Sequence, residues 1–415
     1  MSRVITFYSY KGGTGRSMAL ANIAWVLASN GKRVLAIDWD LEAPGLHRYF
    51  QPFLTDKELN GQESQGVIDM AIDFAVRAAT PVKKGKELSE TWYEPYADFS
   101  KWRQKLRWPS GGSLRLGKTE TGEIDFVPAG RQGADYASRV NHFDWHSFYE
   151  KLRGGAFFDA AKRKFDAYDY VLIDSRTGVS DTSGICTVHM PDTLVVCFTL
   201  NYQSIKGSLA VAQSVRSQRP EMRIFPVPMR IDGSEEKLLN RMKFYAADVF
   251  SPLLDSKINE KEYWYSMEVP YFARYAYAEK LALFEERASI TASTLPAMER
   301  LSEYITTGDV KTAGKLPEQE RVLALEEFEG IEDKDRQRSI GPAEKSSTDS
   351  FKTALEAFRA GEYIRASAYL LLGLFQILVG LVFLGVGLAL LGAGLGAAAS
   401  GGAWLWSLIA PLFTR

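Results

Sequence analysis

The stretch SYKGGTGRS, residues 9–17, decides the fold of this 415-residue chain. It follows a short apolar run at residues 4–8 and precedes an apolar-periodic run at residues 17–30, so it connects an expected strand to an expected helix. A glycine-rich loop in this position turns backbone N–H groups inward and, with the helix dipole, makes a cradle for phosphate. A hydroxyl at Ser17, in the first turn of that helix, suits a Mg²⁺ ligand.

Strand-like and helix-like runs alternate on both sides of this loop. Apolar runs typical of strands lie at residues 4–8, 33–37, 124–128, 170–173, 193–198 and 223–228. Helical patterns lie at residues 17–30, 67–78, 144–164, 205–218, 235–250 and 277–304. This alternation predicts a doubly wound α/β domain with a mainly parallel sheet over residues 1–305.

Residues 80–123 interrupt the alternation and read as an insert. The segment is polar, and Trp92, Trp102 and Trp108 are interleaved with basic residues that include Lys83, Lys84, Lys86, Lys101 and Lys105. Basic and aromatic residues together could contact nucleic acid or phosphate. A solvated helical insert with a small satellite core is the interpretation we favour.

Three motifs in order give the domain a family resemblance. KGGTGRS, at residues 11–17, resembles the deviant Walker A loop of MinD/ParA-type P-loop ATPases, usually KGG-x-GK[ST]. VLAIDWD, at residues 34–40, resembles the strand and D-x-D of the same class, and YVLID with Gly178 resembles Walker B. The resemblance covers residues 1–305 apart from the insert, and implies ATP and Mg²⁺ as cofactors.

The resemblance also implies roles for individual residues. Lys11 resembles the signature lysine that reaches across a dimer to the partner's nucleotide, and Asp40 the residue that orients the attacking water. With Arg16 they form the expected catalytic set. Ser17, Asp38 and Asp174 are the expected Mg²⁺ residues, with Asp174 acting through water. The expected nucleotide-binding set is Lys11, Gly12, Gly13, Thr14, Gly15, Arg16, Ser17, Met18, Arg230 and Pro270. Arg230 and Pro270 fall where this family contacts the base, and no GTP-selecting N-K-x-D is present.

Arg16 departs from the family pattern, which has a lysine inside the loop. A guanidinium keeps the charge and can bond phosphate oxygens bidentately, but it is planar and bulkier. We therefore expect nucleotide binding to survive better than the hydrolysis rate, in a KGG-x-GR variant subgroup. A non-hydrolysing nucleotide-sensing scaffold in a signalling or defence system remains an alternative. Arg176, two residues after Asp174, either supplies a further transition-state cation or is an ordinary surface arginine.

Several other classes are disfavoured by composition. Lys plus Arg is 50 and Asp plus Glu is 51, so the chain lacks the basic surplus of a nucleic-acid binder. Cys186 and Cys197 lack the CxxC spacing of relatives that hold a metal or a cluster, and His142 and His146 alone do not make a zinc site. A bacterial tyrosine kinase of this class carries a tyrosine cluster at its C-terminus, which is absent here, so that alternative is demoted.

The C-terminal part predicts a membrane anchor. Residues 306–350 are a charged linker with one possible short helix at 318–328, and residues 351–365 read as a juxtamembrane helix with Lys352, Arg359 and Arg365. Residues 366–414 contain no Asp, Glu, Lys or Arg, and a spanning helix needs about 20 apolar residues. Residues 366–415 therefore form a membrane hairpin, which we favour, or a single span; a buried core helix is the remaining alternative.

These observations together predict a membrane-anchored ATPase that dimerises across its nucleotide and controls an unidentified protein partner. No signal-peptide pattern precedes the first strand. We expect the inner (cytoplasmic) membrane of a bacterium, with the ATPase domain facing the cytoplasm and binding ATP or ADP. Nucleic acid is an unlikely partner on this sequence.

Overall fold

The computed structural model describes residues 2–80, 89–118, 121–178, 184–255, 257–286, 293–339 and Leu374. The chain divides into two compact units, Met1–Phe328 and Glu329–Arg415. The first unit contains the sheet and the phosphate-loop motif. Of the second unit the structure describes residues 329–339 and Leu374.

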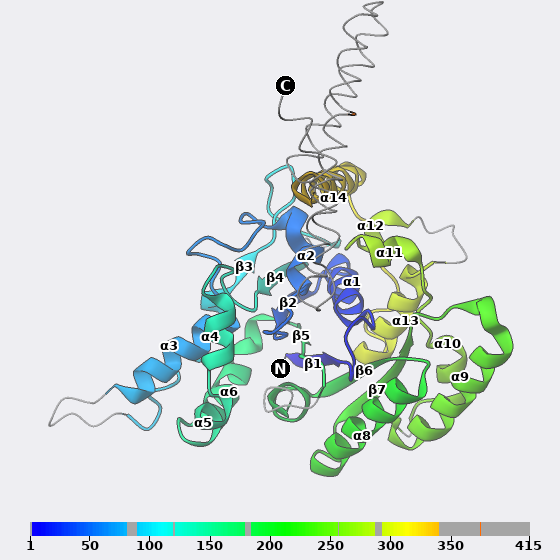
Figure 1. Cartoon of the computed structure of the whole chain (residues 1–415), viewed down its shortest axis with the longest axis horizontal. Coiled ribbons are helices and arrows are strands. Elements are labelled where there is room, and N and C mark those ends of the chain that lie inside the picture. Colours follow the sequence, from blue (N-terminus) through cyan, green and yellow to red (C-terminus); the bar gives the residue numbers. More distant parts are fainter. Residues whose placement is uncertain are drawn as a thin grey trace, which may run out of the picture. The chain divides into compact units, whose positions relative to one another are not determined.

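A seven-stranded sheet in the order β3-β4-β2-β5-β1-β6-β7 forms the centre of the first unit (Figure 1). Six strands run parallel, and β3 pairs antiparallel with β4 at the edge. The strands are β1 (Arg3–Tyr8), β2 (Arg33–Asp38), β3 (Gln104–Lys105), β4 (Glu123–Val127), β5 (Tyr170–Asp174), β6 (Thr193–Thr199) and β7 (Arg223–Met229). The α/β class with a mainly parallel sheet is confirmed.

Helices cover both faces of the sheet. Those of the first half are α1 (Arg16–Ser29), α2 (Leu46–Phe50), α3 (Val67–Ala79), α4 (Tyr136–His142), α5 (Trp145–Glu150) and α6 (Gly154–Arg163). Those of the second half are α8 (Tyr202–Gln218), α9 (Glu236–Phe250), α10 (Glu260–Ser266), α11 (Ala273–Tyr277), α12 (Ala282–Glu285), α13 (Leu295–Thr306) and α14 (Glu318–Ser339). Short 3₁₀ turns lie at Gln51–Phe53, Phe99–Trp102, Lys164–Ala167, Gly233–Glu235 and Ser251–Leu253, and a π turn at Ile185–His189.

Side chains that alternate along β1 pack into two separate hydrophobic cores, one on each face of the sheet. Ile5 and Phe7 pack with α1, α12 and α13, whereas Val4 packs with Trp39, α3 and α6 on the opposite face. Figure 1 shows α3 to α6 to one side of the strands, and α12 and α13 near α1 on the other. Strands buried on both faces are expected of a parallel sheet covered by helices.

The sheet register positions the acidic residues of the motifs. β2 pairs with β5 so that Asp38 lies opposite Asp174, and β1 pairs with β5 so that Phe7 lies opposite Asp174. The carboxyl ends of β1, β2 and β5 therefore meet at one edge, where the phosphate loop begins. Ligands of open α/β sheets bind outside this edge.

Two predicted helices are interrupted. The pattern at residues 144–164 predicts one helix, but α5 and α6 are separated at Arg153, whose φ is 64°. Gly154 allows the close approach at this break, because a Cβ there would lie 2.7 Å from Phe148. The pattern at 277–304 likewise divides into α12 and α13, and α13 has a proline in its first turn.

The insert is not the solvated helical segment that the sequence favoured. Its described residues, 89–118 and 121–123, contain no α-helix; they supply β3 and two isolated bridges, and Trp108, Leu114 and Leu116 join the main core. Trp108 packs against Trp25 of α1, with ring centroids 5.8 Å apart. The insert therefore covers the β4 edge and extends the core.

The compact unit also extends past the predicted domain end at residue 305. Val310, Ala324 and Phe328 are buried, and the Phe328 ring lies 6.2 Å from that of Phe53. The predicted short helix at 318–328 is the beginning of α14. Part of the expected linker, residues 306–328, therefore packs on the domain.

Within the described part of the chain, no helix combines the length and the apolar character that crossing a membrane requires. The predicted juxtamembrane helix (351–365) and membrane segment (366–415) lie outside the described residues, apart from Leu374.

Candidate nucleotide site

The loop between β1 and α1 has the backbone of a phosphate cradle. Gly13 has φ 71° and Gly15 has φ 93°, conformations that residues with a Cβ rarely adopt. The first helical bond runs from the Ala19 N–H to the Gly15 carbonyl at 2.9 Å. The N–H groups of Arg16, Ser17 and Met18 therefore precede the helical ladder, and no side chain caps them.

Arg16 lies inside the protein and is bonded to both motif carboxylates. Its Nε donates to Asp174 Oδ1 at 2.5 Å, and its Nη2 donates to Asp40 Oδ2 at 2.7 Å. Only 5% of the residue is exposed. Burial alone lowers the pKa of the guanidinium, but Asp174 and Asp40 offset this effect and raise the pKa above its usual value. Arg16 thus neutralises two carboxylates that would otherwise be buried without a counter-charge.

Ser17 and Asp174 form the expected metal-side pair. The Ser17 hydroxyl donates to Asp174 Oδ2 at 2.5 Å. Burial raises the pKa of Asp174, while Arg16 and the Ser17 hydroxyl lower it. The structure brings these two predicted residues together.

Asp38 organises the segment that carries Asp40. Its Oδ1 accepts from the Asp40 N–H at 3.1 Å, and its Oδ2 accepts from the Leu46 N–H at 3.2 Å. Burial first, and then the charges of Asp174 and Asp40, raise the pKa of this carboxyl well above its usual range. Asp38 therefore connects the end of β2 to the start of α2. These hydrogen bonds account for its burial without direct coordination of a metal.

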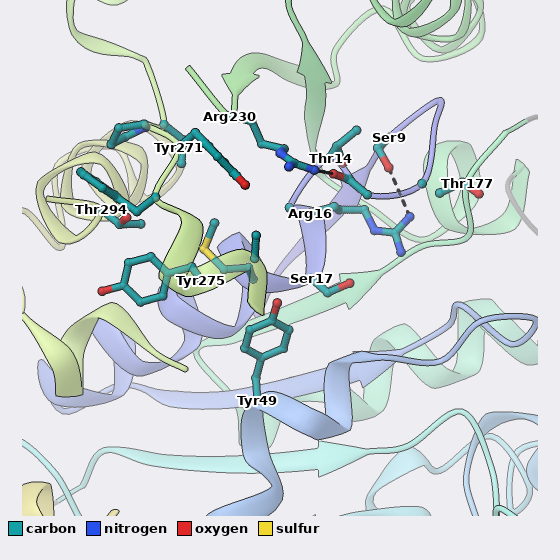
Figure 2. A pocket seen from close by; sticks show the side chains of 18 of the residues that line it. Ser9, Thr14, Arg16, Ser17, Tyr49, Thr177, Arg230, Tyr271, Tyr275 and Thr294 are labelled. Carbon is teal, nitrogen blue, oxygen red and sulfur yellow. Dashed lines mark hydrogen bonds between the residues drawn. The ribbon is translucent and has the colours of Figure 1, made fainter. Parts of the chain in front are cut away.

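A cavity of about 380 Å³ opens over the loop (Figure 2). Most of the predicted nucleotide-binding residues line it: Gly12, Gly13, Thr14, Gly15, Arg16, Ser17, Met18, Arg230 and Pro270. Asp40 lines it as well. Thr14 Oγ1 is buried and has no hydrogen-bond partner in the described part of the chain. The volume of the cavity is within the range of small-molecule sites, roughly 300–1,000 Å³.

Arg230 connects the far wall of the cavity to the phosphate loop. Its Nη1 donates to the Gly13 carbonyl at 2.8 Å, and its guanidinium carbon lies 4.7 Å from the centre of the Tyr271 ring. Its backbone has φ 57°, a costly conformation for a residue with a Cβ. Pro270 is held nearby by a parallel bridge to Ile231.

Lys11 and Arg176 point elsewhere. The Lys11 ammonium donates to Gln203 Oε1, at the start of α8, and Lys11 does not line the cavity. Arg176 Nη2 pairs with Glu42 Oε2 at 2.6 Å. In this conformation, neither cation reaches the cavity that the other motif residues form.

Sequence reasoning missed several residues of the cavity wall. Ser9, Tyr49, Tyr275 and Thr294 line it and belong to no motif. Ser9 lies two residues before the loop lysine, Lys11, and could have been noticed. Tyr49 comes from α2, Tyr275 from α11 and Thr294 from the N-cap position of α13, so only the fold brings them together.

Acidic groups near the loop do not form a closed metal site. Among the residues that the structure describes, no group of three His, Cys, Asp or Glu side chains is arranged to hold a metal. Mg²⁺ is usually held by one or two carboxylates together with substrate phosphates and water. Ser17 and Asp174 fit that incomplete donor set. Both cysteines are buried, and burial raises the pKa of the Cys197 thiol to about 12.

A parallel sheet, a glycine-rich loop leading into a helix, and carboxylates at the ends of two neighbouring strands define a P-loop nucleotide-binding protein. The model of the CobQ/CobB/MinD/ParA nucleotide binding domain family matches residues 5–263. This match covers more than half of the chain, which therefore belongs to the MinD/ParA family of nucleotide-binding ATPases.

Solved structures similar to this chain include three with informative names. A plasmid partition protein from Borrelia burgdorferi B31 bound to AMPPNP is 13% identical, with TM-score 0.47, over 74% of this chain and 99% of that one. The ParA of pNOB8 is 16% identical, with TM-score 0.43, over 80% and 100%. The septum site-determining protein MinD of Pyrococcus horikoshii OT3, complexed with Mg-ADP, is 15% identical, with TM-score 0.36, over 65% and 82%. No curated protein sequence matches the chain.

Proposed function

We propose that this chain is an ATP-dependent dimerisation switch that is anchored to a membrane and controls a protein partner. The observation that carries the nucleotide part is the cavity of about 380 Å³ over the loop, which Ser17 and Asp40 line, with the Ser17 hydroxyl donating to Asp174. The anchor rests on the uncharged residues 366–414. ATP with Mg²⁺ is the cofactor pair that the family and these donors support.

The residues present fit a nucleotide. A Cβ on Gly12 or Gly13 would meet no atom within 4 Å, so space lies open where phosphate oxygens would approach the backbone. The buried Thr14 hydroxyl lacks a protein partner in the described residues. Ser17 and Asp174 would hold Mg²⁺, which supplies charge neutralisation for the phosphates.

Arg16 sets the order of events that we propose for hydrolysis. Its guanidinium is bonded to Asp40 and Asp174, so Asp40 does not act on water while that pairing persists. Phosphate oxygens are competing acceptors, and arginine binds them bidentately. Transfer of the guanidinium towards phosphate releases Asp40 to orient a water molecule. Because this transfer breaks two buried ion pairs, we expect slow turnover.

Lys11 supports the dimer part of the proposal. It lies outside the cavity of its own chain and is held by Gln203, at the surface beside the loop. A lysine that does not serve its own nucleotide is available to a second copy of the chain. We therefore propose that ATP brings two chains face to face, with Lys11 acting in trans.

The test uses the full-length protein in mild detergent. A fluorescent ATP analogue measures binding, and light scattering measures the mass of the protein with and without ATP and Mg²⁺. We expect ATP to double the mass of the wild type, and Lys11→Ala to bind ATP but remain monomeric. Lys206→Ala, on the same helix as Gln203, is the matched control. A mass that ATP leaves unchanged would contradict the switch.

The two ion pairs of Arg16 also favour a second candidate, a nucleotide-sensing scaffold that does not hydrolyse ATP. In that case the guanidinium never leaves Asp40, and nucleotide occupancy alone is the signal. Single-turnover hydrolysis by the wild type and by Asp40→Asn distinguishes the two functions. A higher rate in the wild type supports the switch, and equal rates support the scaffold.

A further inference from the structure

We infer that Tyr49 is a nucleotide-positioning residue, whose hydroxyl donates a hydrogen bond to a nucleotide oxygen common to ADP and ATP. The inference rests on the proposed function, because it concerns the same cavity. Tyr49 belongs to α2 and lies outside all three sequence motifs.

The first observation is the direction of the side chain. The ring is packed against the core that surrounds α1, while the hydroxyl points into the cavity between Ser17 and Tyr275 (Figure 2). On the proposed function, the phosphates bind at the loop end of the cavity, and Tyr271 and Tyr275 lie at the other end (Figure 2). The Tyr49 hydroxyl therefore faces the part of the nucleotide where the phosphates join the sugar.

The second observation is the state of that hydroxyl. It makes no hydrogen bond to any other described residue, whereas the Tyr275 hydroxyl donates to Glu286 Oε1 at 2.8 Å. Burial, with smaller contributions from Glu279 and Asp174, raises the pKa of Tyr49 above its usual value. The phenol therefore keeps its proton and is a donor. A phosphate or sugar oxygen in the cavity supplies the acceptor that the protein does not.

The third observation is the connection of α2 to the carboxylates. The N–H of Leu46, the first residue of α2, donates to Asp38, and Asp38 also accepts from the backbone of Asp40. A hydrogen bond from Tyr49 to the nucleotide consequently fixes the same short segment that positions Asp40. Binding at the sugar–phosphate junction and the geometry of the attacking water are coupled through one turn of helix.

The experiment compares Tyr49→Phe with the wild type in the full-length protein. Phenylalanine keeps the ring and its packing and removes only the donor. Titration with fluorescent analogues gives Kd for ATP and for ADP, and thermal melting gives the stability of the nucleotide-free protein. Tyr263→Phe is the matched control, because that hydroxyl is buried away from the cavity and donates to the Pro226 carbonyl at 2.9 Å.

We expect Tyr49→Phe to weaken ATP and ADP equally, by about 10-fold, since a hydrogen bond to an oxygen that both nucleotides share is lost. The melting temperature without nucleotide should be unchanged, and the rise in melting temperature on adding ADP should shrink. Tyr263→Phe should instead lower the melting temperature of the nucleotide-free protein and leave both Kd values unchanged. Unchanged Kd values, a loss for ATP alone, or an equal fall in nucleotide-free stability would overturn the inference. Absence of ATP binding by the wild type would instead overturn the proposed function.

Discussion

Arg16 does two things that a lysine in its place could not do together. Its planar guanidinium reaches Asp40 and Asp174 at once, through different nitrogens. A lysine has a single charged atom, and it can be shared between two carboxylates only if both approach the same point. The arginine therefore stabilises the nucleotide-free site, and the same two bonds would oppose the rearrangement that we propose for hydrolysis.

Substitution of Arg16 should separate stability from turnover. Arg16→Ala leaves Asp40 and Asp174 without their buried partner, and should destabilise the protein by about 3–5 kcal/mol. Arg16→Lys should cost less, on the order of 1–2 kcal/mol, because one ion pair survives. We expect Arg16→Lys to hydrolyse ATP several-fold faster, since fewer bonds must break. Urea denaturation and single-turnover hydrolysis measure the two effects.

The control for these substitutions is Arg241→Lys, which changes an exposed arginine on α9. It should alter neither stability nor rate. If Arg16→Lys were as slow as the wild type while binding ATP normally, the two ion pairs would not limit turnover.

The site residues that could be predicted are those held together by the chain itself. Loop residues 11–17 are consecutive, and Asp40 and Asp174 follow strands whose apolar runs are visible in the sequence. The order of strands then places these ends together. Tyr49 and Thr294 could not be found in this way, because helix packing across the cavity brings them near the loop, and no local pattern records that packing.

At the scale of elements, α2 carries a partly buried histidine, His47, as well as Tyr49. Burial first, and then Arg48, lower the pKa of His47 to about 4, from 6.5, so the folded state keeps the imidazole neutral. Below pH 6.5 the unfolded chain binds a proton that the folded protein does not. The contribution of His47 to the free energy of unfolding is therefore lost as pH falls from about 6.5 to about 4.

We expect His47 to contribute up to about 3.5 kcal/mol to this pH dependence, since one pKa unit corresponds to about 1.4 kcal/mol. The measurement is urea denaturation at several pH values for the wild type and for His47→Gln. Other groups titrate in both proteins, so the difference between the two curves is the informative quantity. Parallel curves between pH 6.5 and 4 would show that His47 is not responsible.

Helix α8 supports the phosphate loop through a glycine. A Cβ on Gly207 would lie 2.2 Å from Cδ1 and 2.4 Å from Cγ of Tyr10, the residue before Lys11. Both atoms are near the base of the ring, so the clash cannot be relieved by moving the far end of the side chain. Tyr10 must therefore shift at the start of the loop.

Gly207→Ala should therefore weaken ATP binding, by about 10-fold, with little change in overall stability. The gain from replacing a helical glycine, roughly 0.5–1 kcal/mol, partly offsets the clash. Calorimetric titration with ATP and thermal melting test both parts. Gly233→Ala, where a Cβ would meet nothing within 4 Å, should leave both unchanged. Wild-type affinity in Gly207→Ala would mean that the loop does not depend on Tyr10.

Element prediction failed where tertiary contacts override periodicity. The apolar pattern of residues 144–164 is continuous, yet Gly154 packs so closely against Phe148 that the chain turns between α5 and α6. In the insert, Trp108 is buried against α1, far away in the sequence. Both outcomes depend on which other part of the folded chain the segment packs against, and the composition of the segment does not contain that information.

At the scale of the whole molecule, the chain combines a charged nucleotide-binding domain with a long uncharged tail. The mean hydropathy of -0.17 averages these two parts and resembles neither. Residues 366–414 lack Asp, Glu, Lys and Arg, and Lys352, Arg359 and Arg365 precede them. This arrangement is typical of a span whose positive flank stays in the cytoplasm. A true span holds the protein at the membrane whatever nucleotide is bound.

We therefore expect full-length protein to sediment with membranes after washing at high salt and at alkaline pH, and to be released only by detergent. A chain ending at Ser339 should be found in the supernatant. Because about 20 apolar residues suffice for spanning, ATP and ADP should not change the distribution, and Lys11→Ala should behave as the wild type. Release of the full-length protein by alkaline washing, or on ATP removal, would indicate a reversible surface attachment. Nucleotide would then control whether the protein is bound to the membrane. With an integral tail, nucleotide would control only whether two membrane-bound chains dimerise.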